Sequence, residues 1–457
     1  MLFGGLFAKV DRDIYWGRTV PKHGPGAVAD KLSSNAKWNQ RTWTTRLQRV
    51  LPAEEFLYPS QRHVGLDEGH HLLEPGAETP VRVITVPKTL KAPRVIAIEP
   101  TAMQYAQQAI KRALVDAVSE DGFLSRVVGF DDQEPNRFLA RHGSHSGDTA
   151  TLDLSEASDR VSNQHVLAML DGYPHLLEGV QATRSRKADV PGFGVLRLAK
   201  YASMGSALCF PIESMVFLTI IFLGIERELS APLSRKQVVN LFSEQVRVFG
   251  DDLIVPRDYV LSVVNELHTF GYVVNVDKSF WTGRFRESCG REYFDGHDVS
   301  IVKVREVLPT RRQDASGVVS VVSLRNQLYQ AGLWGTVRWL DDYIRGILSY
   351  FPNVAPTSPL LGRVSFLGYE FQGLDPNTHG PLTKGYYVSS KSPIDKLDGT
   401  GALLKCLLQN HPERDSFAVA TEDFLDRDPL PSSNADHLER SGRPDVVNIK
   451  LGRRSPF

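Results

Sequence analysis

The chain has 457 residues, of which 42% are hydrophobic and 23% charged, so a collagen-like or wholly disordered chain is excluded. Lysine and arginine together number 53, as do aspartate and glutamate, so any phosphate-binding surface must come from local clusters of charge. Three widely spaced cysteines provide neither a zinc site nor an even set of disulfides, which fits a reducing cytoplasm.

The first third of the chain predicts a mixture of helices and strands. Short helices around loops are expected up to about residue 70, and no secretory signal is expected because no basic segment precedes the short apolar start. Residues 81–86 and 94–98 predict strands on either side of a basic turn. Residues 101–118 have the hydrophobic spacing of a helix.

Two apolar strand patterns carry acidic residues. Residues 149–152 predict a strand that ends on Asp153. Residues 246–249 and 253–255 predict a hairpin with Asp251 and Asp252 at its turn. If these strands are neighbours, the three carboxylates converge at one edge of a sheet.

Further helices are expected in the second half of the chain. The run from residue 207 is apolar almost all round, which predicts a helix in the centre of a domain; its apolar part, 215–225, is too short to span a bilayer, so no membrane is expected. A helix at 260–270 and a strand at 272–276 follow. Helical spacing resumes after Pro309, and the polar tail from about residue 412 is expected to be loosely ordered.

Three convergent carboxylates suit two magnesium ions, with manganese as an alternative, because hard cations prefer oxygen ligands. Such a pair of ions serves nucleotidyl transfer. Ordinary structural roles remain open, since a single Asp153 is more often a turn or capping residue and a Gly-Asp turn is common in hairpins. Adjacent aspartates nevertheless oppose each other's ionisation unless a cation compensates them.

The order of these segments resembles the palm of a polymerase. LDLSEASD, YASMGSALCFPIES and VFGDDLIV resemble motifs A, B and C. With VPKTLKAPRVIAIEP (86–100), NVDKSF (275–280) and FRESCG (285–290), residues 81–310 are similar to the replicase subunit of the single-stranded RNA bacteriophages, the leviviruses. The resemblance implies an α+β fold shaped as a right hand, with fingers, a palm whose antiparallel sheet packs on helices, and a thumb.

The resemblance also implies roles for individual residues. Asp153 and Asp251 would bind both ions, with Asp252 as a further ligand, and Lys278 would protonate the leaving pyrophosphate. The nucleotide-binding residues would be Lys88, Lys91 and Arg94 at the triphosphate, Ser158 and Asp159 at the ribose, and Ser203, Gly205 and Ser206 in the loop before the buried helix. The basic turn could also be a solvated loop, and Ser203 or Ser206 a helix cap.

The implied domains follow the same order along the chain. They are a shortened N-terminal fingers or thumb-contacting segment (1–70), fingers with motif F (71–147), palm with motifs A to E and a fingers insertion near 165–200 (148–310), helical thumb (311–410) and C-terminal tail (411–457).

The function implied is RNA-directed RNA polymerization that replicates a phage genome from ribonucleoside triphosphates, in the cytoplasm of the bacterial host. Implied partners are template and product RNA, the host translation elongation factors Tu and Ts, and ribosomal protein S1. A reverse transcriptase and a non-catalytic RNA-binding remnant remain alternatives; a generic magnesium hydrolase leaves the other motifs unexplained. Ser158 stands where reverse transcriptases carry Phe or Tyr, which favours ribonucleotides.

Overall fold

A computed structural model describes residues 2–64, 69–86, 93–391, 398–409 and 446–457. The described residues form two compact units. The larger unit is built from parts of Met1–Ile84, Val95–Ser300 and Asp395–Arg440, and the smaller from parts of Thr85–Arg94, Ile301–Ile394 and Ser441–Phe457. Helices and strands occur in both units, so the predicted α+β class is confirmed.

A four-stranded antiparallel sheet in the order β10-β5-β9-β8 carries the acidic residues of the larger unit. Its strands are β5 (Thr149–Ser155), β8 (Arg247–Phe249), β9 (Asp252–Pro256) and β10 (Val273–Val274). The predicted hairpin is confirmed as β8–β9, and Gly250 in its turn has φ +61°, a conformation that favours glycine.

Two boundaries in this sheet differ from prediction. The expectation that the first strand ends on Asp153 is wrong, because β5 continues to Ser155. Leu154 and Ser155 pair with β10, and this long-range pairing extends the strand beyond the local apolar pattern. The strand predicted at 272–276 is reduced to β10, since a 3-10 turn, η3 (Val276–Lys278), follows it.

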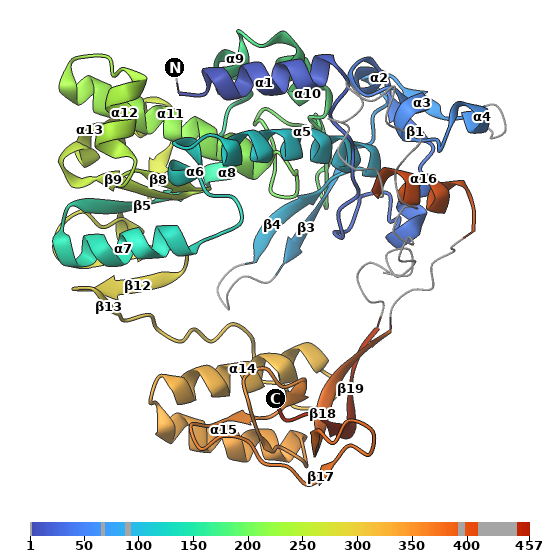
Figure 1. The fold of residues 1–457 in the computed structure, drawn as a ribbon, viewed down its shortest axis with the longest axis vertical. Helices are drawn as coiled ribbons and strands as arrows, with labels where there is room; N and C mark the ends of the chain where they lie inside the picture. The colour runs from blue at the N-terminus through green and yellow to red at the C-terminus, as the bar shows by residue number, and fades with distance from the viewer. Residues whose placement is uncertain (1, 65–68, 87–92, 392–397, 410–445) are drawn as a thin grey trace, which may run out of the picture. The chain divides into compact units, whose positions relative to one another are not determined.

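The buried helix predicted from residue 207 is α11 (Cys209–Leu229), which forms the centre of the larger unit's core. Helix α13 (Val260–Thr269) packs against α11, and a Cβ at Gly224 would lie 2.7 Å from the Cα of Val263. Glycine therefore allows the two helices to approach closely. Helix α7 (Glu134–Ser146) lies alongside β5, β8 and β9 (Figure 1). It also contacts the hairpin formed by β11 (Phe285–Ser288) and β12 (Arg291–Phe294).

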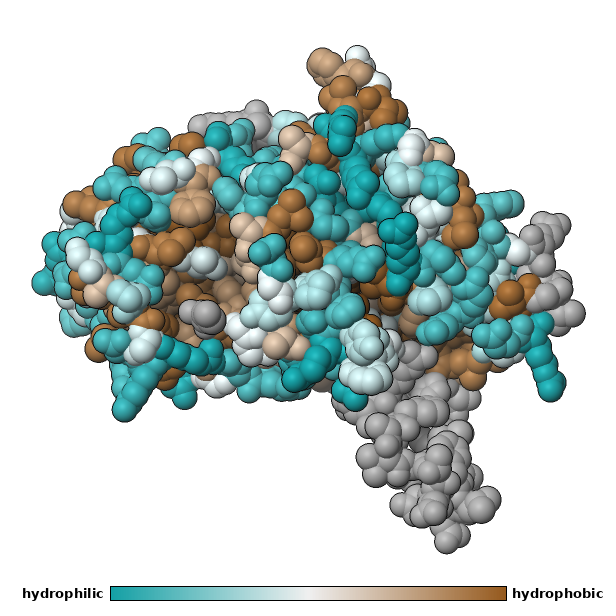
Figure 2. Space-filling view, turned by 90° about the horizontal axis from the view of Figure 1, so that it is seen from above, coloured by the Kyte–Doolittle hydropathy of each residue, from teal (hydrophilic) through white to brown (hydrophobic). Residues whose placement is uncertain are grey.

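By length and composition, α11 is one helix in the described part of the chain that could cross a membrane. However, 78% of its most apolar stretch is buried inside the protein. Figure 2 shows hydrophilic residues over much of one face of the molecule, with hydrophobic residues in separate patches among them. Burial of α11 in the core accounts for its apolar composition.

A second sheet in the larger unit has the strand order β4-β3-β6-β7. The predicted strands are confirmed as β3 (Val81–Val86) and β4 (Arg94–Ile98). They are joined by β6 (Lys187–Val190) and β7 (Gly194–Arg197), and β6 runs parallel to β3. Segments about a hundred residues apart in the sequence therefore build one sheet.

The remaining elements of the larger unit surround these sheets (Figure 1). The predicted helix after β4 is confirmed as α5, which spans Thr101–Glu120. The others are α1 (Gly4–Tyr15), η1 (Ser34–Asn39), β1 (Thr42–Thr44), α2 (Thr45–Val50), α3 (Ala53–Phe56), α4 (Gln61–Val64), β2 (His71–Leu73), α6 (Leu124–Val127), α8 (Ala157–Arg160), α9 (Asn163–Leu170), α10 (Pro174–Ala182), α12 (Arg235–Phe242), η2 (Arg257–Tyr259), β11 (Phe285–Ser288), β12 (Arg291–Phe294), β13 (His297–Asp298) and α16 (Thr400–Gln409).

The smaller unit combines two helices with short sheets and has its own hydrophobic core. The helical spacing after Pro309 is confirmed by α14 (Ala315–Gln330) and α15 (Trp334–Ile347). Strands rather than helices follow, namely β14 (Asn353–Val354), β15 (Leu360–Leu361), β16 (Arg363–Val364), β17 (Gly373–Leu374), β18 (Pro381–Lys391) and β19 (Val446–Arg454).

The C-terminal tail differs in part from the expectation of loose order. Strand β19 pairs antiparallel with β18 along its whole length, from Val446 opposite Lys391 to Arg454 opposite Thr383. This pairing orders the end of the chain, where Val447, Ile449 and Leu451 alternate with polar residues as in a strand. Residues 410–445 of the predicted tail lie outside the described residues.

Candidate active site

Strands β5 and β9 bring two of the predicted carboxylates together. Asp153 and Asp252 are direct partners in the antiparallel register, and Asp251 precedes Asp252 in the β8–β9 turn. Asp251 is exposed, whereas Asp153 and Asp252 are partly buried. The register therefore gathers the three aspartates at one place on the sheet.

The clustering changes the acidity of Asp252. The pKa of Asp252 is raised to about 6, mainly by burial and also by the negative charges of Asp251 and Asp153. A hydrogen bond from the backbone N–H of Cys289 acts in the opposite direction. A bound cation would favour the ionised form of this carboxylate, because it would offset the repulsion among the three charges.

Asp153 is surrounded by residues of the segment that follows β10. Asn275 Nδ2 donates a hydrogen bond to Asp153 Oδ2 at 3.0 Å, and the Asp153 N–H donates to Ser279 Oγ at 3.0 Å. Lys278 Nζ lies 3.9 Å from Asp153 Oδ2, and about half of the lysine side chain is exposed (52%). Lys278 is therefore a cation beside the acidic cluster that can still reach solvent.

The FRESCG segment forms the hairpin β11–β12, and its turn contacts Asp252. The N–H of Cys289 donates to Asp252 Oδ1 at 3.1 Å, and Ser288 Oγ donates to the same oxygen at 3.5 Å. Cys289 is buried. Sequence analysis missed its contact with Asp252 because a backbone N–H has no side-chain signature.

The residues at the cluster fit a divalent cation by their chemistry. Asp153, Asp251 and Asp252 supply the hard oxygen ligands that Mg²⁺ and Mn²⁺ prefer, and the pKa of Asp252 is raised first by burial and then by the charges of its two neighbours. In the described residues, no three His, Cys, Asp or Glu side chains already stand at metal-binding spacing. Asp153 and Asp252 instead accept hydrogen bonds from protein donors.

The residues predicted at the ribose lie beside a buried acid that sequence analysis missed. Ser158 hydrogen-bonds to Glu213 of α11, and Cys209 Sγ donates to Glu213 Oε2 at 3.8 Å. Burial raises the pKa of Glu213 to about 8, and the Asp251 charge contributes to the increase. The available signal was a single charged residue, Glu213, within the apolar stretch 209–225 of α11. Asp159 is exposed and forms an ion pair with Lys200.

The loop before α11 is held against strand β4. The N–H of Ala97 donates to the carbonyl of Met204 at 2.8 Å. Gly205 has φ +126°, and a Cβ there would lie 1.9 Å from the Ala97 oxygen. Ser203 is buried, and Ser206 Oγ accepts a hydrogen bond from the Leu208 N–H at 3.3 Å. The loop therefore requires glycine for close backbone approach.

The predicted triphosphate-binding residues are only partly visible. Arg94 is exposed at the first position of β4. Lys88 and Lys91 lie outside the described residues.

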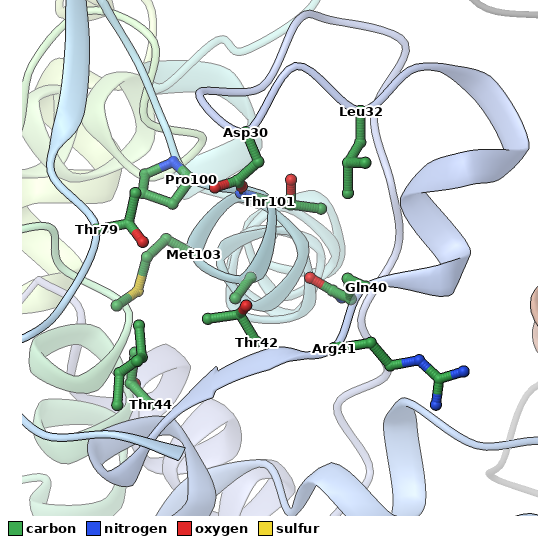
Figure 3. A pocket seen from close by; sticks show the side chains of 12 residues that line it. Asp30, Leu32, Gln40, Arg41, Thr42, Thr44, Thr79, Pro100, Thr101 and Met103 are labelled. Atoms are coloured by element: carbon green, nitrogen blue, oxygen red, sulfur yellow. The ribbon is translucent and has the colours of Figure 1, made fainter. Parts of the chain in front are cut away.

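A separate cavity of about 120 Å³, lined by both polar and apolar residues, lies where α5 begins (Figure 3). Asp30 Oδ2 accepts a hydrogen bond from the Thr101 N–H there at 2.6 Å and so caps α5. None of the predicted site residues lines this cavity, so the acidic cluster on β5 and β9 remains the candidate site.

The antiparallel sheet with carboxylates on β5 and on the β8–β9 hairpin, next to the buried α11, is the arrangement of a polymerase palm. Residues 76–342, more than half of the chain, match the family model described as RNA replicase, beta-chain. The chain belongs to this family.

Curated relatives are similar to part of the chain. It is 33% identical to the RNA-directed RNA polymerase subunit beta of Qbeta virus (strain MX1), over 57% of this chain and 40% of the relative. It is 29% identical to the RNA-directed RNA polymerase beta chain of Enterobacteria phage fr, over 67% and 50%. The chain therefore spans about half, or less, of the length of these relatives. Among solved structures, the RNA-dependent RNA polymerase of a human picorbirnavirus is 12% identical over 54% of this chain and 52% of its own, with a TM-score of 0.40.

Proposed function

We propose that the chain is an RNA-directed RNA polymerase that copies a phage single-stranded RNA genome from ribonucleoside triphosphates. The observation that carries the proposal is the register of β5 and β9, in which Asp153 faces Asp252 beside Asp251. The family supports it, since the relatives are named RNA-directed RNA polymerases.

Asp153, Asp251 and Asp252 would hold two Mg²⁺ or Mn²⁺ ions. When bound, such ions supply activation of the attacking 3′ hydroxyl and neutralisation of the leaving pyrophosphate. Lys278 would donate a proton to that pyrophosphate, a role supported by its exposed position 3.9 Å from Asp153. Lys88, Lys91 and Arg94 would bind the triphosphate through charge-assisted hydrogen bonds.

The ribose would lie at Ser158 and Asp159, with Ser203, Gly205 and Ser206 close to the template and the sugar. Ser158 has a small side chain, so it leaves room for a 2′ hydroxyl, and Asp159 would hydrogen-bond to that hydroxyl. The hydrogen bond from Ser158 to Glu213 supports a fixed orientation of the serine hydroxyl.

The partners and location proposed for the chain follow its family. They are template and product RNA, the host translation elongation factors Tu and Ts, and ribosomal protein S1, in the cytoplasm of the infected bacterium. Addition of each purified host protein to a synthesis assay tests these partners one at a time.

Asp252→Asn tests the proposed chemistry, because it removes one charge from the cluster with little change of shape. RNA synthesis should fall about a hundredfold or more, since cation stabilisation of the transition state amounts to several kcal/mol. RNA binding should persist. Asp258→Asn is the matched control, because Asp258 is an exposed aspartate just beyond the other end of β9. Full synthesis by Asp252→Asn would contradict the proposed role, and RNA binding without synthesis by the parent chain would indicate a binding remnant.

The choice of nucleotide separates the proposal from a reverse transcriptase. On an RNA template the chain should incorporate ribonucleotides in preference to deoxyribonucleotides. The opposite preference would favour the reverse transcriptase.

A further inference from the structure

Two consecutive residues of α7 are linked to Asp252, Asn136 directly and Arg137 through the backbone of Cys289. Asn136 Nδ2 donates to the backbone carbonyl of Asp252 at 3.5 Å. Arg137 donates from Nε and Nη2 to the carbonyl of Cys289, at 3.3 and 3.2 Å. The N–H of the same Cys289 donates to Asp252 Oδ1 at 3.1 Å. Helix α7 therefore contacts the backbone of Asp252 directly and its carboxylate through the β11–β12 turn.

The contact between Asn136 and the backbone of Asp252 is held in place by a further buried residue. Asn136 is fully buried, and its Oδ1 accepts a hydrogen bond from Arg247 Nε at 2.9 Å. Arg247 is buried at the start of β8 and also donates to the carbonyl of Arg126. Helix α7 and the β8–β9 hairpin are thus joined by a network of buried hydrogen bonds, which limits relative movement.

The turn that supplies the N–H has an unusual backbone conformation. Cys289 has φ +49° and the following Gly290 has φ +72°. A non-glycine residue keeps such a conformation where its surroundings determine it. Cys289 and Gly290 are the two central residues of the β11–β12 hairpin, whose turn type requires positive φ at both, and in this turn the Cys289 N–H donates to Asp252 while its carbonyl accepts from Arg137.

We propose that Arg137 is a positioning residue for the cation site, acting through the Cys289 backbone to orient the Asp252 carboxylate. In this arrangement Cys289 and Ser288 donate to Oδ1, so a divalent cation would be bound by the carboxylate whose orientation these donors hold. Groups that orient metal ligands in this way commonly change metal affinity by 10–100-fold. The inference rests on the cation site of the proposed function.

Arg141 provides a matched control on the same helix. It lies one turn after Arg137, and its Nε donates to the carbonyl of Gly296 at 2.7 Å, in the turn after β12. Arg141→Met and Arg137→Met each remove a hydrogen bond from an arginine of α7 to a backbone carbonyl in the segment β11–β13. It does not affect the residue that binds Asp252.

The test measures Mn²⁺ binding by the full chain. Electron paramagnetic resonance reports the bound ion, and nucleotide and RNA are left out. Arg137→Met should weaken binding about tenfold, whereas Arg141→Met should bind as the parent does. In synthesis assays, Arg137→Met should need more Mn²⁺ for half-maximal rate but keep the parent's KM for nucleotide at saturating metal. Equal Mn²⁺ affinity of Arg137→Met and the parent, or equal weakening by both variants, overturns the proposal.

Arg137→Lys keeps the test informative if Arg137→Met does not fold. Lysine retains the charge and a hydrogen-bond donor but cannot make the two-pronged contact of arginine. Mn²⁺ binding several-fold weaker than the parent's therefore supports the proposal, and unchanged Mn²⁺ binding overturns it. The outcome is separable from that of the proposed function. If Arg137→Met weakens Mn²⁺ binding while the parent makes no RNA, the positioning role stands and the polymerase function fails.

Discussion

Glu213→Gln should alter the pH dependence of folding stability. Glu213 is 4% exposed within α11, and burial raises its pKa to about 8 from an ordinary 4.5. The folded protein therefore holds a proton that the unfolded chain releases as pH rises through this interval. The stability contributed by the protonated carboxyl is fully present below about pH 4.5 and is lost progressively up to about pH 8.

The size of the effect follows from the width of this interval. Each pH unit within it reduces the free energy of unfolding by about 1.4 kcal/mol, so the parent should lose about 2–3 kcal/mol from this group between about pH 5 and about pH 7. Glutamine has a similar shape and cannot ionise. Glu213→Gln should therefore gain about 2–3 kcal/mol relative to the parent over the same range.

Urea unfolding of parent and variant at the two pH values measures this difference, because contributions from other titrating groups cancel between them. Glu228→Gln is the control, since Glu228 lies in the same helix with its side chain exposed. It should show no such dependence. If the difference between Glu213→Gln and the parent is the same at both pH values, the carboxyl is already ionised and its burial as a neutral acid is refuted.

Two further substitutions test the framework of the site. Gly205→Ala should lower the melting temperature and reduce the free energy of unfolding by several kcal/mol, because its Cβ would lie 1.9 Å from the Ala97 oxygen. The control is Gly192→Ala, at φ +83° in open space, which should show only the smaller cost of backbone strain. Equal losses of stability in the two variants would exclude the clash. Arg46→Met should cost about 3–5 kcal/mol, because Arg46 and Glu78 form a buried pair with two 2.7 Å contacts and the carboxylate would lose its partner. Adding Glu78→Met should restore much of that loss, and no recovery in the double variant in urea unfolding would argue against this explanation.

The sequence specified the elements whose signal is local. The apolar run of α11, the strands of the β8–β9 hairpin and its Gly250 turn follow from hydrophobic spacing and turn chemistry over a few residues. The chain order of the motifs also suggested that Asp153 would meet Asp251 and Asp252, and the register of β5 and β9 agrees with this.

Tertiary structure decided what depends on distant segments. The pairing of β6 with β3, of β10 with the end of β5, and of β19 with β18 joins strands that local composition cannot match. Strand pairing uses backbone groups that every residue carries, so several partners are compatible with the same pattern.

The acidic residues could be predicted from the sequence, whereas the groups that contact them could not. The sequence by itself indicated which carboxylates to expect at a cation site, because the order of the motifs singles out Asp153, Asp251 and Asp252 and carboxylate oxygens are hard ligands. Only the fold decided that Cys289 offers its N–H to Asp252, that Arg137 binds the Cys289 carbonyl, and that Glu213 lies buried against Ser158. The burial of a side chain and the direction of a backbone N–H or C=O group arise from packing between distant segments, so neither can be predicted from one segment alone.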